Sequence, residues 1–290
     1  MIDVSGIIEG TLVEGSIYAL VGAGFVVLYR ATKVLNFAQG SLMALGAFVF
    51  RDIAVSHKTG LFLGLVLTLI AMAVLGGLLY LLVFRRLTDA PPFVTIIATL
   101  GLAVVIETVF YLVWGVNVLS VPNYFGTSNV NIGIKLPWVD GFVIIEAVVL
   151  LVLLELLLQR STIGVRMRGI ADNSRLASFV GVSVYQISAI AWAVSCVCAG
   201  AAGVALALQS AVDPVSIQGV GFDAFPAIVL GGLDSFRGVM IGSLVLAFVG
   251  SSIATIFNGQ WVDIGSYLIL VVIVIFRPTG LFGSRDAARV

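Results

Sequence analysis

Two amide side chains interrupt an otherwise apolar stretch near the start of the chain. Asn36 and Gln39 stand three residues apart, and Gly40 follows directly, within "VLNFAQGSLMALGAFVF" over 34–50. On a helix, positions three apart are neighbours on one face. Because a desolvated amide without a hydrogen bond costs roughly 1–3 kcal/mol, we expect both amides to bond to a neighbouring helix or to water. They either hold a short segment in a bundle or line a route for a polar solute.

Carboxylates are the other groups in apolar stretches that could act on a solute. Glu107, Glu146 and Asp223 lie in three different stretches, and Glu14 lies in the first. An ionisable side chain at membrane depth is a candidate for a substrate or ion pathway. The candidate pathway residues are Asn36, Gln39, Gly40, Glu107, Glu146 and Asp223. A proton relay would need some of these carboxylates to meet in space, and the sequence places them one to a segment.

The residues needed for covalent or metal chemistry are not found together. His57 is the only histidine, and Cys196 and Cys198 are the only cysteines. Two residues apart on a helix means roughly 200° apart, so these thiols point to opposite sides and should not form a bridge. A G-x-x-x-x-G-K-[ST] nucleotide loop is not found. We therefore predict no catalytic residues, no metal site and no cofactor, and the net charge of zero gives no ground for a nucleic-acid partner.

Composition places these residues in a membrane protein. The 290 residues are 60% hydrophobic and 10% charged, with a mean hydropathy of +1.18, whereas a soluble domain is about 25% charged. A lipid-crossing helix needs about 20 residues. The apolar stretches are 6–29, 34–50, 60–84, 93–114, 139–158, 186–208, 222–235, 238–257 and 262–276. We predict an all-α, polytopic membrane helix bundle with about eight or nine membrane segments, forming a single transmembrane domain over 1–290.

Two of the stretches, 34–50 and 222–235, are too short for ordinary spanning helices. The second carries Pro226 early and Gly231-Gly232 late, which remove a backbone donor and loosen the helix. Irregular backbone at membrane depth survives only where protein or a water-filled cavity satisfies it. Paired short, broken segments therefore indicate a transport pathway, although two tilted helices with packing glycines fit as well. Small residues at every fourth position over 191–211 predict close helix packing.

The distribution of Lys and Arg predicts the orientation. Crossing of all nine stretches, with the N-terminus outside, places twelve of the fifteen basic residues in the cytoplasm. The three that fall outside are Arg51, Lys58 and Lys135. If 34–50 were a re-entrant loop, the cluster over 160–175 would face outside, which fits the positive-inside rule poorly. We therefore expect an outside N-terminus and a cytoplasmic C-terminus.

One polar loop on the predicted cytoplasmic side, 159–186, is long enough to have a structure of its own. Asp172-Asn173-Ser174 is a good helix start, and Gly181 is a stop signal. We expect a short helix over 169–181, lying off the membrane, where it could receive force from an energy-supplying partner protein. The alternative is that the loop serves only as a positive-inside anchor.

Four stretches of the chain carry a family resemblance. They are 15–48 with "NFAQG" at 36–40, "TLGLAVVIE" at 99–107, the loop and Ala/Gly-rich helix over 164–206, and "FPAIVLGGLDSFRGVMIG" at 225–242. Together they resemble the permease subunits of ABC importers for branched-chain amino acids and related amides and urea. One departure is Arg237, which stands where a proline before Gly238 is expected. Residues 115–138 match little.

The resemblance implies a role for the loop and a set of partners. The residues it implies for the coupling loop are Gly169, Ala171, Asp172, Asn173, Arg175, Leu176 and Gly181. It implies a second homologous permease subunit, two ABC ATPase subunits that hydrolyse ATP, an extracytoplasmic solute-binding protein and surrounding lipid, in the cell membrane of a prokaryote. Urea, short amides or other small carboxylates remain alternative substrates. A stand-alone channel or secondary transporter remains the alternative of another class.

Overall fold

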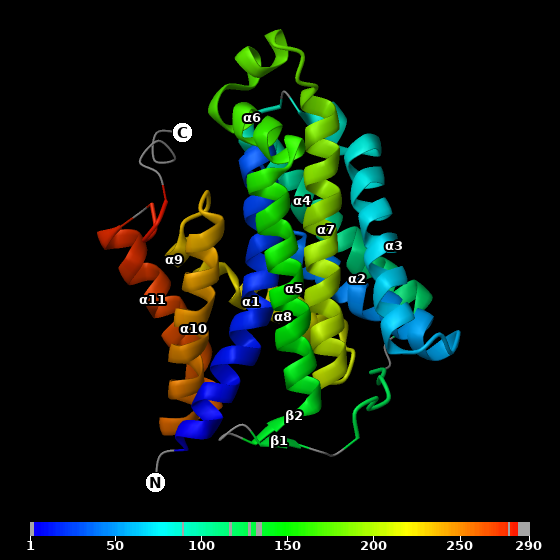
Figure 1. The fold of residues 1–290 in the computed structure, drawn as a ribbon, viewed down its shortest axis with the longest axis vertical. Helices are drawn as coiled ribbons and strands as arrows, with labels where there is room; N and C mark the ends of the chain where they lie inside the picture. The colour runs from blue at the N-terminus through cyan, green and yellow to red at the C-terminus, as the bar shows by residue number, and fades with distance from the viewer. Residues whose placement is uncertain are drawn as a thin grey trace.

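The computed structural model describes residues 3–88, 90–115, 118–126, 129–131, 135–277 and 279–283. Within them the protein is a bundle of helices with one small hairpin (Figure 1). Seven helices in the described part of the chain are long and apolar enough to cross a membrane. They are α1 (Val4–Thr32), α3 (Leu61–Leu82), α4 (Pro92–Val113), α5 (Trp138–Arg160), α7 (Val184–Gln209), α10 (Phe236–Ile256) and the span Gly259–Phe276, which contains α11 (Val262–Phe276). The predicted polytopic all-α bundle is confirmed.

Shorter elements connect the spans. The helical ones are α2 (Gln39–Arg51), which continues into a π-helix (Asp52–Ser56), α6 (Thr162–Phe179), α8 (Pro214–Asp223), α9 (Phe225–Gly231) and 3-10 turns at Phe84–Leu87 and Gly259–Trp261. Strands β1 (Asn129–Asn131) and β2 (Lys135–Pro137) pair antiparallel, with Val130 opposite Leu136. The segment expected over 222–235 thus holds the last two residues of α8, the short helix α9 and a turn, because Pro226 lies in the first turn of a new helix, where its missing N–H costs nothing.

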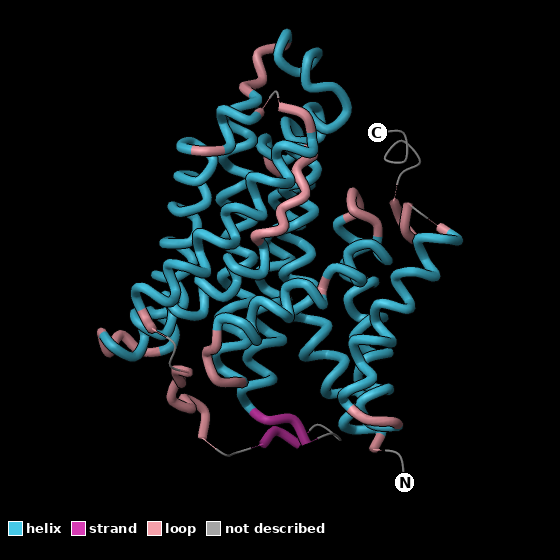
Figure 2. Tube along the Cα trace, turned by 180° about the vertical axis from the view of Figure 1, so that it is seen from behind, coloured by secondary structure: helices cyan, strands magenta, loops and turns pink. Residues whose placement is uncertain are grey.

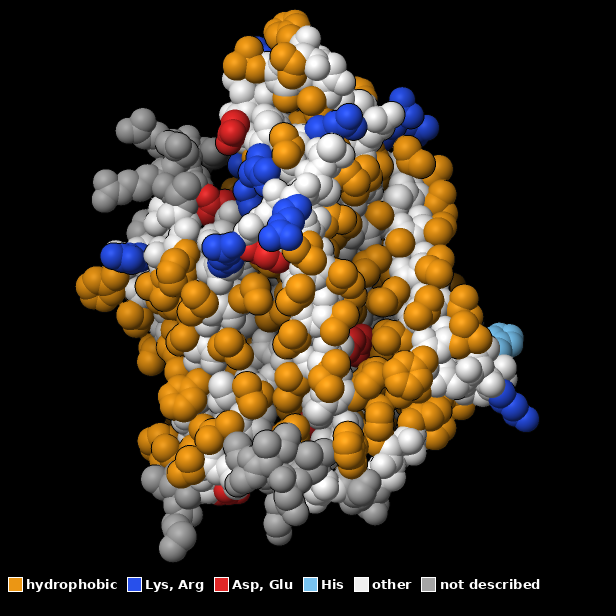
Figure 3. All heavy atoms as spheres, viewed as in Figure 1, with side chains coloured by type: hydrophobic (Ala, Val, Ile, Leu, Met, Phe, Trp, Pro, Cys, Tyr) orange, Lys and Arg blue, Asp and Glu red, His pale blue; other side chains and the backbone are white. Residues whose placement is uncertain are grey.

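Helices α1 and α7 form the centre of the bundle, while α3, α4, α5 and α11 turn apolar faces outward (Figure 3). The small residues of α7 allow α2 to approach its backbone closely. A Cβ atom on Gly203 would lie 2.0 Å from the Met43 carbonyl oxygen, and one on Gly46 would lie 2.5 Å from the Gly200 Cα. The stripe predicted over 191–211 is buried as far as Ala207, and Ala211 lies beyond the helix end and is exposed.

The two ends of the bundle carry different elements and different numbers of basic side chains. The N-terminus and the β1–β2 hairpin lie at one end, and α6 lies at the opposite end, as Figures 1 and 2 show from the two sides. Helix α11 runs from the N-terminal end toward the α6 end. On the face drawn in Figure 3, Lys and Arg side chains gather toward the α6 end. This arrangement matches the separation of basic residues that the sequence predicts.

Candidate functional site

The amide pair lies at a turn ahead of α2 and not on one helical face. Helix α2 begins at Gln39 with Ala38 as its N-cap, so Asn36 lies outside the helix. The Asn36 Oδ1 accepts from the Ala38 N–H at 3.1 Å, and Asn36 Nδ2 donates to Gln39 Oε1 at 3.0 Å. A shared helical face would need one continuous helix through both amides. Instead the Asn36 side chain bonds to the backbone next to it, as Asn favours, and the helix begins only at Gln39.

Long-range hydrogen bonds tie this turn to two other helices. Gln39 Nε2 donates to the Ser195 carbonyl oxygen at 3.3 Å, and Ser195 Oγ donates back to Gln39 Oε1 at 3.1 Å. On the α4 side, Thr99 Oγ1 accepts from the Phe37 N–H at 3.3 Å. Asn36, Gln39, Ser195 and Thr99 are all buried. The expectation of a bond to a neighbouring helix is confirmed for Gln39, which reaches α7, whereas the printed bonds of the Asn36 side chain stay within its own turn.

The first short segment, 34–50, packs against α8, whose last two residues begin the second short segment, 222–235. A Cβ atom on Gly221 of α8 would lie 2.4 Å from the Gly40 Cα, and one on Gly40 would lie 2.6 Å from the Gln218 carbonyl oxygen. Beside this contact Gln218 Nε2 donates to Ser41 Oγ at 3.0 Å. Only glycine allows backbones so close. We call this contact of α2 with α8 the crossing.

A small cavity lies next to the crossing, at the break between α8 and α9. Its volume is about 20 Å³, and Asn36, Gln39, Phe222 and Phe225 are among the residues around it. A cavity needs about 10–15 Å³ to hold one water molecule, together with polar partners. Each of the two amide groups has a second N–H that could meet such a water. The broken backbone is therefore enclosed by protein with room for one water.

The three candidate carboxylates do not come together. Asp223 ends α8 and lies close enough to Glu14 of α1 and Asp263 of α11 for their charges to interact. Glu146 is buried on α5, and neither of its carboxylate oxygens has a hydrogen-bond partner among the described residues. Glu107 is half-buried on α4. Sequence reasoning missed Asp263, whose one signal is a carboxylate at the start of the last apolar stretch.

Helix α6 carries the expected start and stop signals. It is kinked at Asn173, where φ is −158° and ψ is 102°. There Asn173 Oδ1 accepts from the Leu176 N–H at 3.0 Å and caps the second piece of the helix. Gly181 has φ of +85°, a value that favours glycine. The start at 172–174 and the stop at Gly181 are confirmed, although α6 begins earlier than expected, at Thr162.

The far end of α6 extends beyond the spans (Figure 1), and apolar side chains there are exposed. Leu176, Phe179 and Val180 are 62%, 84% and 80% exposed. The other coupling-loop residues behave as a polar surface: Gly169, Asp172, Asn173 and Arg175 are exposed, and Ala171 is half-buried. An apolar group with a polar rim is typical of surfaces that contact another protein. We call Leu176, Phe179 and Val180 the α6 tip.

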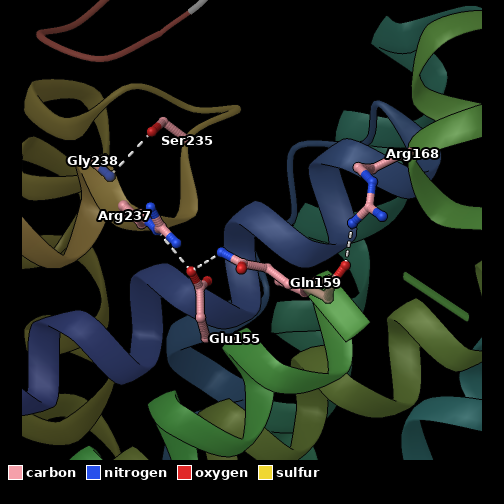
Figure 4. Close-up of polar contacts among 7 residues, drawn as sticks. Glu155, Gln159, Arg168, Ser235, Arg237 and Gly238 are labelled. Carbon is pink, nitrogen blue, oxygen red and sulfur yellow. Dashed lines mark hydrogen bonds and ion pairs between the residues drawn. The ribbon is translucent and has the colours of Figure 1, made fainter. Parts of the chain in front are cut away.

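A polar cluster lies at the same end, between α5 and α10 (Figure 4). Arg237 Nε donates to Glu155 Oε1 at 2.7 Å, and the same oxygen accepts from Gln159 Nε2. Arg168 of α6 donates to the Leu158 carbonyl oxygen. The sequence has no local signal that links Glu155 to Arg237, because the two residues are 82 positions apart.

Comparison with known proteins gives a consistent result. Residues 7–276 match the family described as "Branched-chain amino acid transport system / permease component". The high-affinity branched-chain amino acid transport system permease protein BraD of Pseudomonas aeruginosa is 25% identical, with 96% of this chain and 95% of that protein covered. LivH of Escherichia coli K12, named as the same kind of permease, is 23% identical, with 95% and 94% covered. A probable LivH of Methanocaldococcus jannaschii is 26% identical, with 96% and 92% covered.

A solved structure, "PsaBC from Streptococcus pneumoniae in complex with Fab", resembles the chain at 12% identity with a TM-score of 0.48. It covers 94% of this chain and 92% of the other.

Proposed function

The chain belongs to the branched-chain amino acid transport permeases, and on that premise we propose that it is one permease subunit of an ATP-driven importer. Members of this family are multi-pass membrane transport proteins and not enzymes. In the proposed assembly this chain forms the translocation pathway together with a second, homologous permease subunit. Two separate ABC ATPase subunits hydrolyse the ATP, and an extracytoplasmic binding protein delivers the solute.

The α6 tip carries the proposal of ATP-driven transport. Its three apolar side chains stand on a capped helical piece beyond the spans, where lipid does not cover them. A stand-alone channel or secondary transporter has no need for such a surface. A groove on an ATPase subunit would bury it, and movement of that groove would reach α5 directly through the connection at Ser161. This geometry supports the proposed coupling role of Gly169 to Gly181.

We place the translocation route beside the crossing of α2 and α8. Broken helices at membrane depth are typical of solute pathways, and here two of them meet around a polar turn that protein fully encloses. Asn36, Gln39 and Gly40 hold this arrangement together. Asp223, with Glu14 and Asp263 close by, is the carboxylate best placed to meet a solute near the crossing. Glu107 and Glu146 lie on other helices, and their part in the pathway stays a hypothesis.

The orientation follows from the basic residues. We place the α6 end in the cytoplasm and the N-terminus outside the cell membrane of a prokaryote, with the whole chain as a single transmembrane domain. The gathering of Lys and Arg at the α6 end supports this orientation.

Branched-chain, hydrophobic amino acids are the proposed substrate class, because the relatives BraD and LivH are named for their transport. Urea, short amides and other small carboxylates are the runner-up substrates. The experiment is uptake of labelled leucine into liposomes that contain this chain with its co-expressed permease, ATPase and binding-protein partners. We expect uptake that needs both ATP and the binding protein. Equal uptake by this chain alone would establish the stand-alone transporter instead.

A further inference from the structure

A pocket of about 680 Å³ lies at the α6 end of the molecule. Its walls come from the ends of α1 and α3, the starts of α4 and α7, and the kinked part of α6. This volume lies within the range of pockets that hold small molecules. Asn36, Gln39 and Gly40 do not line it, so it is separate from the crossing. The proposed transport function assigns it no role.

The pocket carries an excess of positive charge. Arg30 and Lys33 come from the end of α1, and Arg175 comes from α6. Asp172 is the one carboxylate among the described residues of the lining, and in the described part of the chain no ion pair within 4.0 Å joins it to these cations. Three cations around one concave site, with a single carboxylate among the described residues of its lining, focus a positive potential that attracts anions.

An unsatisfied donor lies in the same lining. Trp192 is fully buried, and its Nε1–H has no hydrogen-bond partner among the described residues. The indole is held in place by stacking on Phe84, with ring centroids 4.0 Å apart. Leaving a buried donor unmet costs about 1–3 kcal/mol. The Nε1 atom itself has no surface open to the pocket, so Trp192 forms a fixed apolar wall of the site, and the cations select the occupant.

From these observations we propose that the pocket binds a phosphate-bearing anion, of the kind found in the head group of an anionic phospholipid. The site lies at helix ends, where basic pockets between membrane helices bind such head groups. Tyr80, Phe84 and Tyr185 supply aromatic wall next to the cations, as residues at a membrane interface do. A bound phosphate would join Arg30 and Lys33 of α1 to Arg175 of α6 and brace the coupling helix against the bundle.

A transported amino acid fits the lining less well. Its single carboxylate is balanced by an ammonium group, so it would leave most of the positive charge uncompensated. A phosphate group keeps its net negative charge and offers several acceptor oxygens to the cations. The excess of cations therefore favours an occupant of the pocket that carries a net negative charge.

The test uses the permease purified together with its co-expressed subunits, in nanodiscs of phosphatidylcholine with or without phosphatidylglycerol. The variant Arg30→Gln with Lys33→Asn removes two of the three cations. Asn suits position 33 because Lys33 has φ of 57°, in the left-handed region that Asn tolerates. The matched control is Arg86→Gln with Arg160→Gln, which removes two exposed cations that are not part of the described pocket lining. Arg86 lies in a 3-10 turn and Arg160 ends α5, both at the same end of the bundle as the pocket.

We expect phosphatidylglycerol to raise the unfolding temperature of the wild type and of the control. In the pocket variant this increase should be lost, and the affinity for phosphatidylglycerol in native mass spectrometry should fall about tenfold or more, since charge-assisted hydrogen bonds are the stronger ones. Arg175→Gln removes only the third cation of the lining. It should weaken binding severalfold, which provides a second readout if the double variant does not insert.

Each other outcome is decisive. Inorganic phosphate that competes with the lipid at millimolar concentration would make the free ion the natural source and leave the site as proposed. Equal lipid binding by the wild type and the pocket variant would refute it. Displacement of phosphatidylglycerol by leucine would also refute it and assign the pocket to the transported solute.

Discussion

Arg237 at the start of α10 donates from Nε to Glu155 Oε1 at the end of α5, at 2.7 Å (Figure 4). The contact joins two helices far apart in the sequence, at the end of the bundle that also carries α6. Arg237 occupies the position where the family resemblance leads one to expect a proline. A proline there would have no charge to offer Glu155, so the ion pair depends on this departure from the expected turn.

We expect this ion pair to contribute little to stability, because the Arg237 side chain is 72% exposed and exposed pairs contribute about 0–1 kcal/mol. The changes are Arg237→Gln, Glu155→Gln and the two together. A double-mutant cycle on thermal unfolding should give an interaction energy below about 1 kcal/mol, decreasing further in high salt. An interaction energy of several kcal/mol would contradict this and indicate that the ion pair holds α5 and α10 together.

The hydrogen bonds of the amide pair predict a packing role. In Asn36→Leu with Gln39→Leu, Ser195 loses both of its bonds to Gln39, and each unmet buried group costs about 1–3 kcal/mol. We expect assembly with the partner subunits and the unfolding temperature to fall together with uptake. The control is Asn258→Leu with Gln260→Leu, which changes two exposed amides in a turn and should leave assembly intact. Normal assembly with lost uptake would assign the amides to transport instead.

The α6 tip predicts a variant that inserts but does not couple. Arg175→Glu with Leu176→Glu adds negative charge and removes an exposed apolar side chain at the proposed ATPase contact. Stimulation of ATP hydrolysis by loaded binding protein should fall to the basal rate, while membrane insertion is unchanged. The matched control is Val165→Glu with Arg166→Glu, on the first part of α6, where both residues are also exposed. Wild-type stimulation in the Arg175/Leu176 variant would rule out this contact.

Accessibility of single cysteines tests the orientation. Cys196 and Cys198 are both buried and are first replaced by alanine. A cysteine at Val118, exposed in the loop after α4, should react with a membrane-impermeant maleimide from outside. A cysteine at Ser174 should react only after the membrane is opened. Reaction of both from the same side would contradict the odd number of crossings between them.

The crossing predicts a steric limit at one position. Gly221→Val places a branched side chain where even a Cβ atom would lie 2.4 Å from the Gly40 Cα, so the two backbones must separate. We expect a loss of about 1–3 kcal/mol or more in unfolding stability, as for overpacked sites. Gly219→Val is the control, because a Cβ atom there meets nothing within 4 Å. Equal stability of the two variants would argue against a close crossing.

Local patterns determined much of the fold. Apolar runs of sufficient length predicted the spans, because backbone groups in lipid must be bonded within the segment. Pro226 predicted irregular backbone over 222–235, and Asn173 and Gly181 predicted the cap and stop of the α6 end, because these residues act on the backbone next to them. The amides of Asn36 and Gln39 also predicted that protein, and not lipid, surrounds them.

The tertiary structure alone decided which of these residues meet. Gln39 reaches Ser195 across 156 positions, α2 packs on α8 at Gly40 and Gly221, and Glu155 pairs with Arg237. A sequence carries no local signal for such pairs, because each depends on how whole helices pack and tilt. The same reason explains why the candidate carboxylates, alike in sequence, ended in different surroundings: Glu146 is enclosed and unbonded on α5, whereas Asp223 lies beside other carboxylates near the broken helices.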